Sequence, residues 1–140
     1  MNHDSYRDDY LRGIFKRVKT IAMVGASPRP DRPSNHVMQF LQGRGFRVIP
    51  VNPQVAGGTL HGEKIYASLA EIPETIDMVD IFRRSELVAP VVAEAIAKGT
   101  KVIWMQLGVR DDAAAKKAEA AGIDVVMNRC PAIEIPRLRI

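Results

Sequence analysis

Short apolar runs alternate with amphipathic segments along most of this chain, and the alternation predicts strands that are followed by helices. Five runs are typical of buried parallel strands, at residues 20–24, 47–51, 78–82, 101–107 and 124–127. Helical spacing between them predicts helices from Ser34 to Gly45, from about Pro90 to Gly99, and from Asp111 or Asp112 to Gly122. We therefore expect an α/β, doubly wound, five-stranded parallel sheet that is Rossmann-like, with strand order 3-2-1-4-5 and helices on both faces.

The segment before the first strand predicts one additional helix. Apolar side chains recur at helical spacing within residues 1–18, and Asp4 is a plausible N-cap. This N-terminal helix is expected to pack on the sheet, although the pattern leaves open whether it closes the core or forms a dimer. The 140 residues suit a single domain, 1–140, that ends in a short basic tail after Pro131.

Composition places the chain among ordinary globular proteins, with 46% hydrophobic and 26% charged residues. No run approaches the ~18 apolar residues of a membrane-spanning helix, and the charged N-terminal segment lacks the apolar core of a signal peptide. One cysteine, Cys130, supports neither an internal disulfide nor a zinc site. A cytoplasmic location and no membrane partner are expected.

The net charge of +4 suggests that the ligand is an anion. Arginine supplies most of the 20 basic residues, and its planar guanidinium suits phosphate or carboxylate. Nucleic acid is a weaker candidate, because no continuous basic run exists and only 6% of residues are aromatic. A small anionic ligand is favoured over nucleic acid.

In an open parallel sheet the ligand lies beyond the carboxyl ends of the strands. The first such loop begins at Gly25, carries Arg29 and Arg32, and leads to a helix end that attracts phosphate. The loop is not G-x-G-x-x-G, and the second strand ends at Asn52 without the acidic residue that holds an NAD ribose. A ligand with an additional phosphate is therefore favoured over NAD.

Four ordered motifs carry a family resemblance: GASPRPDRPSNHVMQFLQGRGFRVIPVNP, VDIFRRSE, WMQLGV and NRCP. They resemble the small single-domain CoA-binding proteins and the CoA-binding domain of the succinyl-CoA synthetase alpha subunit, from about Lys19 to Leu138. The resemblance implies that Gly25, Ala26 and Ser27 approach the diphosphate of coenzyme A. It also implies phosphate contacts from Arg29 and Ser34.

The resemblance extends to the loops after the second and third strands. Asn52 and Pro53 would lie near the adenosine part of the ligand. Phe82 and Arg83 would flank the adenine or the pantetheine arm. The implied site therefore spans several strand ends.

The remaining implied contacts concern the pantetheine arm. Gln106 and Gly108 would line its route, with Asn128 and Cys130 near its far end. A lone thiol before a proline is usually buried and inert. The alternative is that Cys130 captures coenzyme A reversibly as a mixed disulfide under oxidation.

One departure bears on catalysis. Succinyl-CoA synthetase alpha subunits need a second domain with a phosphorylated histidine and a partner beta subunit, and residues 1–140 carry neither. His3, His36 and His61 lie outside any matching motif. We expect no catalytic residue and no metal site, and a function in binding coenzyme A or an acyl-CoA, as a regulator or carrier module.

Two alternatives from other classes stay open. An NADP-dependent oxidoreductase domain would explain the fold, the missing ribose acid and the arginines. A nucleic-acid-binding domain would need a clustered basic face that the sequence does not show. Besides the small-molecule ligand, a homodimer or an unidentified protein partner is compatible with the pattern.

Overall fold

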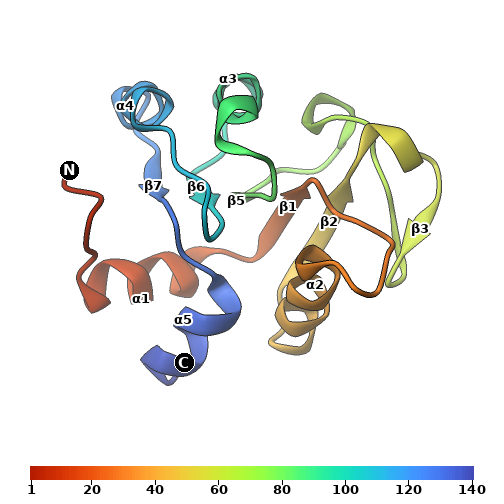
Figure 1. Cartoon of the computed structure of the whole chain (residues 1–140), viewed down its shortest axis with the longest axis horizontal. Coiled ribbons are helices and arrows are strands. Elements are labelled where there is room, and N and C mark those ends of the chain that lie inside the picture. The colour runs from red at the N-terminus through yellow and green to blue at the C-terminus, as the bar shows by residue number, and fades with distance from the viewer.

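A five-stranded parallel sheet organises the computed structural model, which describes residues 1–140 (Figure 1). Its strands are β1 (Thr20–Val24), β2 (Arg47–Val51), β5 (Met78–Ile81), β6 (Val102–Met105) and β7 (Asp124–Val126). A separate two-stranded ribbon, β3 (Thr59–Leu60) and β4 (Glu63–Lys64), lies in the connection between β2 and β5. The expected α/β fold class is confirmed.

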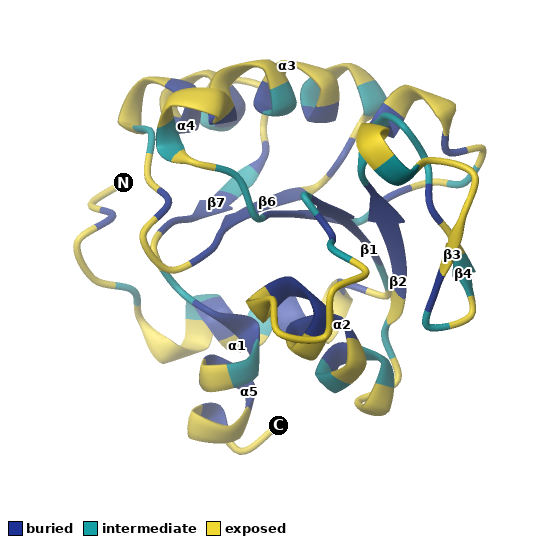
Figure 2. Ribbon diagram, turned by 45° about the vertical axis from the view of Figure 1, so that its right-hand side comes forward, coloured by how far each residue is buried: buried dark blue, intermediate teal, exposed yellow.

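Helices cover both faces of the sheet (Figure 1). One face carries α1 (Asp8–Arg17), α2 (Pro33–Gly43) and α5 (Pro131–Leu138), and the other carries α3 (Val88–Lys98) and α4 (Asp112–Ala120). Three short 3-10 helices complete the chain, at Pro53–Val55, Leu69–Glu71 and Ser85–Leu87. The strands are almost entirely buried between these layers, which explains their continuous apolar runs (Figure 2).

The expected strand order 3-2-1-4-5 is wrong. The sheet runs β2-β1-β5-β6-β7, which is 2-1-3-4-5 when its strands are numbered along the chain. Pro50 lies in β2 and has no N–H to donate, so a position at the sheet edge suits this strand. Tyr66 forms an isolated parallel bridge with that edge, where the Tyr66 amide donates to the Pro50 carbonyl (3.0 Å). The third long strand therefore pairs with β1, and the strand order reverses between β1 and β5.

The N-terminal helix is shorter than expected. It begins at Asp8 with Arg7 as its N-cap, and Asp4 instead pairs with Arg110 (2.9 Å). Its apolar residues Leu11, Ile14 and Phe15 are buried against the chain's own sheet, so α1 closes the core.

Two other helix ends differ from the expectation. Ser34 is not the N-cap of α2, because Arg32 takes that position and Pro33 begins the helix. The expected basic tail is α5, whose buried residues Pro131, Glu134, Ile135 and Leu138 recur at helical spacing.

No helix combines the length and the apolar character that crossing a bilayer requires.

Candidate functional site

Gly25 is the point where the ends of three strands meet. Its φ is +89°, and a Cβ atom there would lie 2.1 Å from the carbonyl oxygen of Phe82, the residue after β5. The Gly25 amide donates to the Val51 carbonyl at the end of β2 (2.9 Å). The Phe82 amide donates to the Val24 carbonyl at the end of β1 (2.8 Å). Only glycine permits this close approach of the first loop to β5.

Polar side chains hold the loop after Gly25 in one shape. The Ser27 amide donates to Oγ of Ser34 (3.0 Å), and the Asn35 side-chain amide donates to the Ser27 carbonyl (3.1 Å). From the residue after β2, the Asn52 side-chain amide donates to the Ala26 carbonyl (2.8 Å). Ser34 and Asn35 are both buried, so this loop is anchored to the first turn of α2.

A cleft of about 530 Å³ opens above this loop. Its lining comes from the ends of β1, β2 and β5 and from the start of α2, namely Gly25, Ser27, Pro28, Arg29, Arg32, Pro33, Ser34, Asn52, Gln54, Val55 and Phe82. The cleft sits beside the strand-order reversal between β1 and β5, where ligands bind in open parallel sheets.

Positive charge dominates the cleft. Arg29 pairs with Asp31 (3.1 Å), and both side chains are largely exposed, while Arg32 has no carboxylate within 4.0 Å. The first turn of α2 contains no acidic residue, so nothing on the helix neutralises the positive end of its dipole. An anion such as phosphate would therefore be stabilised at this place.

The main-chain amides of the first turn already donate to acceptors within the protein. Those of Gly25 and Ala26 both donate to the Val51 carbonyl (2.9 and 3.3 Å), and that of Ser27 donates to Ser34. The three prolines of the loop have no amide hydrogen to offer. The donors left for an anion are thus side chains, namely Arg29, Arg32, Gln54 and the hydroxyls of Ser27 and Ser34, together with the start of α2.

The structure brings together part of the expected site. Six expected residues line the cleft: Gly25, Ser27, Arg29, Ser34, Asn52 and Phe82. Three others are their chain neighbours, of which Ala26 is buried, Arg83 is half-buried and Pro53 is exposed. Gln54 and Val55 were missed, although they follow the expected Asn52-Pro53 directly.

Four expected residues lie outside this cleft, near the ends of β6 and β7. The Gly108 amide donates to the side-chain oxygen of Asn128 (2.7 Å), which joins the two loops. Gln106 and Cys130 are buried, with 6% and 7% of their surface exposed. These residues form a second group at the carboxyl ends of the strands, the same end of the sheet at which the cleft lies.

Asp80 is a polar residue that the sequence analysis missed. It lies in β5 in register with Met23 and Trp104, is fully buried, and neither carboxyl oxygen has a hydrogen-bond partner. Burial raises the pKa of this carboxyl well above its usual value. The side-chain oxygen of Gln106 is also buried without a partner. Asp80 stands inside an otherwise apolar strand, so no pattern signalled it.

Comparisons with known proteins identify relatives of similar length. The chain is 38% identical over 120 residues to the uncharacterized protein YneT of Bacillus subtilis, covering 86% of this chain and 87% of that protein. A solved structure of a hypothetical protein from Pyrococcus horikoshii superposes with a TM-score of 0.93 at 41% identity. That superposition covers 100% of this chain and 97% of the other.

Relatives with a named activity match over a shorter stretch of this chain. The chain is 33% identical over 97 residues to the alpha subunit of ADP-forming acetate–CoA ligase I of Pyrococcus furiosus. The match covers 66% of this chain but only 21% of that subunit. Residues 19–136 match the family model described as a CoA binding domain, so the chain belongs to the CoA-binding domain family.

Proposed function

We propose that this chain binds coenzyme A or an acyl-CoA in the cleft at the start of α2 and catalyses no reaction itself. The observation that carries the proposal is an arginine-bearing cleft beside the strand-order reversal, in a member of the CoA-binding domain family. The cleft's volume of about 530 Å³ lies in the ordinary range of small-molecule sites, roughly 300–1,000 Å³.

In this proposal the diphosphate lies against Arg29, Arg32 and the first turn of α2. Gly25, Ala26 and Ser27 shape the wall that the diphosphate meets, and Ser34 holds that wall through its bond to Ser27. The fixed loop means that little ordering is required when the ligand binds.

The adenosine part lies near Asn52, Pro53, Phe82 and Arg83. The pantetheine arm follows the strand ends toward Gln106, Gly108, Asn128 and Cys130. The Gly108–Asn128 hydrogen bond joins the loops after β6 and β7 into one surface at the carboxyl ends of the strands (2.7 Å).

The biological role we propose is that of a regulator or carrier module in the cytoplasm. The ligase subunit of Pyrococcus furiosus is much longer than this chain, since the match spans 21% of it. An acyl-CoA-forming activity therefore does not transfer to these 140 residues on similarity alone.

A thermal-shift titration with coenzyme A, dephospho-CoA, acetyl-CoA and NADP tests the ligand. A ligand that binds only the native state stabilises it by RT ln(1 + [L]/Kd), so selective binding gives a selective shift. We expect larger shifts with coenzyme A or acetyl-CoA than with NADP. A shift with NADP alone would favour the reductase alternative, and no shift with any of the four would contradict the proposal.

Arginine variants test where the phosphates lie. Arg29→Ala or Arg83→Ala should weaken binding of coenzyme A about tenfold. If either side chain meets the 3′-phosphate, binding of dephospho-CoA should weaken less. Arg84→Ala is the matched control, because Arg84 is the exposed neighbour of half-buried Arg83, pairs with Glu86 and has no part in the proposed site. Equal losses for both ligands would refute the 3′-phosphate assignment.

A further inference from the structure

β7 is an edge strand, and no other strand pairs with its outer side. The Asp124 amide donates to the Lys101 carbonyl on the β6 side (3.1 Å). Because these directions alternate along a strand, the main-chain groups of Val125 and Met127 face away from β6. An uncovered edge of this kind is a template for pairing with another chain.

Two tyrosine hydroxyls bond to these outward groups. The Tyr10 hydroxyl donates to the Val125 carbonyl (2.9 Å), and the Met127 amide donates to the Tyr6 hydroxyl (2.8 Å). The two rings stack, with their centroids 5.9 Å apart and 14° between their planes. Burial raises the pKa of both phenols, so the Tyr10 hydroxyl keeps the proton that it donates. Side chains thus satisfy one acceptor and one donor of the edge.

The opposite edge of the sheet shows what this arrangement replaces. There Tyr66 forms a parallel bridge with β2, in which its amide donates to the Pro50 carbonyl (3.0 Å) and its carbonyl accepts from the Asn52 amide (2.9 Å). One residue of a parallel neighbour therefore bonds to a carbonyl and to the amide two residues further along. At β7 the two hydroxyls bond to a carbonyl and an amide at this same spacing. They take the place of one residue of a sixth strand.

The N-terminal segment, residues 1–7, runs alongside β7 and carries Tyr6 (Figure 1). Residues 1–6 form no hydrogen bond between main-chain groups. Side chains hold the segment instead: Asp4 pairs with Arg110 (2.9 Å), and the Arg129 guanidinium lies 5.1 Å from the centroid of the Tyr6 ring. Segments with so few main-chain bonds are the ones that open locally at low cost.

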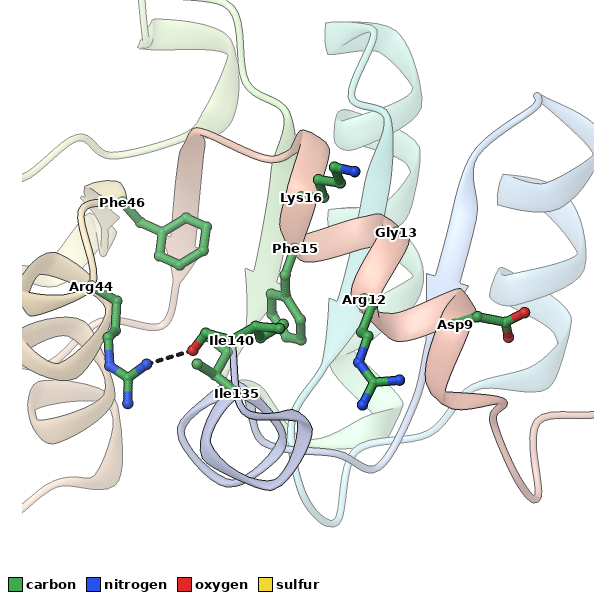
Figure 3. A pocket seen from close by; sticks show the side chains of 9 residues that line it. All are labelled: Asp9, Arg12, Gly13, Phe15, Lys16, Arg44, Phe46, Ile135 and Ile140. Atoms are coloured by element: carbon green, nitrogen blue, oxygen red, sulfur yellow. Dashed lines mark hydrogen bonds between the residues drawn. The ribbon is translucent and has the colours of Figure 1, made fainter.

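The first helix, α1, contacts the edge of β7 through one of its faces. Tyr10 and Arg17 lie two turns apart on this face, and Arg17 pairs with Asp124 at the start of β7. Arg12 and Lys16 belong to another face of α1, which lines a cavity of about 710 Å³ (Figure 3). Neither tyrosine lines that cavity, so substitutions at the tyrosines leave its lining unchanged.

We infer that the β7 edge is an interaction surface for a second copy of this chain, and that Tyr6 and Tyr10 keep it closed. The edge is complementary to itself. Across a two-fold axis at Val126, the Met127 amide of each copy meets the Val125 carbonyl of the other in an antiparallel pair. Release of the N-terminal segment leaves these groups without partners and favours the pairing. The inference is independent of the function proposed for the cleft.

Sedimentation velocity over a range of protein concentrations tests the association. We expect Tyr6→Ala/Tyr10→Ala to associate one step further than the original protein, to an extent that rises with concentration. Tyr66→Ala is the matched control, because Tyr66 covers the edge of β2 with its main chain, which the substitution retains. Circular dichroism establishes that each variant is folded. No additional association of the folded double variant, or equal association of Tyr66→Ala, would overturn the inference.

Amide hydrogen exchange followed by NMR locates the contact. Tyr6→Phe keeps the ring and removes only the hydroxyl, so the Met127 amide should exchange about tenfold faster. The Val126 amide faces β6 and should exchange as before. In the associated double variant, protection of the Met127 amide should return as the protein concentration rises. Unchanged Met127 exchange in Tyr6→Phe, or association that leaves this amide unprotected, would refute the role of the edge.

Discussion

Substituting Gly25 by alanine should lower both the stability of the fold and the affinity for the ligand. Gly122→Ala is the control that separates the effect of the close contact from that of the backbone conformation. Gly25 and Gly122 share a positive φ, +89° and +83°. A side chain in this region costs about 1–2 kcal/mol at either position. The Cβ of Gly122 would have nothing within 4 Å, whereas that of Gly25 would lie 2.1 Å from Phe82 O and 2.9 Å from Phe82 C.

The clash at Gly25 has no flexible side chain to absorb it. Ordinary contact begins at 3.4 Å, so the main chain of Phe82 or of the first loop must move by more than an ångström. That movement strains the bond from the Phe82 amide to Val24, which joins β5 to β1 (2.8 Å). Overpacking of this kind adds about 1–3 kcal/mol to the cost.

Urea unfolding of both variants measures the difference. We expect Gly122→Ala to lose about 1–2 kcal/mol, and Gly25→Ala to lose roughly 1–3 kcal/mol more. Coenzyme A should bind Gly122→Ala normally and Gly25→Ala weakly, because the shifted loop carries the wall of the cleft. Equal losses of stability in the two variants would refute the close-approach argument.

Two further predictions concern buried groups. Burial raises the pKa of Asp80, so the native state keeps a proton that the unfolded chain releases above about pH 4, and stability should fall as pH rises from there. Asp80→Asn should remove this loss. Measured by urea unfolding, the free energy of unfolding of the variant minus that of the original protein should grow with pH by at most about 1.4 kcal/mol per pH unit. A difference that stays constant between pH 4 and 8 would contradict the assignment. Cys130, 7% exposed, should resist CoA disulfide in the folded protein and form the mixed disulfide, with release of one coenzyme A thiol, once urea unfolds the chain. A mass adduct on the folded protein that Cys130→Ser abolishes would instead support capture of the ligand thiol.

Most helices and strands could be predicted because each has a strong local signal. Both faces of β1, β5 and β6 are buried, and this gives uninterrupted apolar runs that local reading detects. Pairing between strands leaves no such local trace. Pro50 was the available clue, since a residue without an N–H favours an edge strand, and it would have argued against placing β2 between two others.

The missed helix α5 has a different cause. Pro131 and Pro136 both fall within it, and the sequence analysis predicted only a short basic tail after Pro131. Proline is tolerated in the first turn, which accommodates Pro131, but it is unfavourable in the interior, where Pro136 lies. Burial of Ile135 and Leu138 against the sheet compensates for the interior proline, and this tertiary contribution cannot be seen in local spacing.

The candidate site was predictable in position and less so in its donors. The rule that ligands lie at the carboxyl ends of strands selected the loop after Gly25 and the loop at Asn52. The family resemblance added Phe82, and the structure brings all three to one cleft. Asp80 could not be selected, because one acidic residue within an apolar strand has no pattern of its own. Its burial depends on how β1, β6 and the helices pack around β5.

The hydrogen bonds of the first loop decide what kind of recognition the cleft can offer. In a glycine-rich dinucleotide site, the main chain approaches the pyrophosphate directly. Here the amides of Gly25, Ala26 and Ser27 are committed to Val51 and Ser34, so they stiffen the loop instead of meeting the ligand. Anion binding must then rest on side chains, among which only Arg29 and Arg32 carry charge, and on the start of α2. A guanidinium fork matches the oxygens of a phosphate wherever that phosphate stands on a ligand, so this mode of recognition is compatible with the coenzyme A proposed for the cleft.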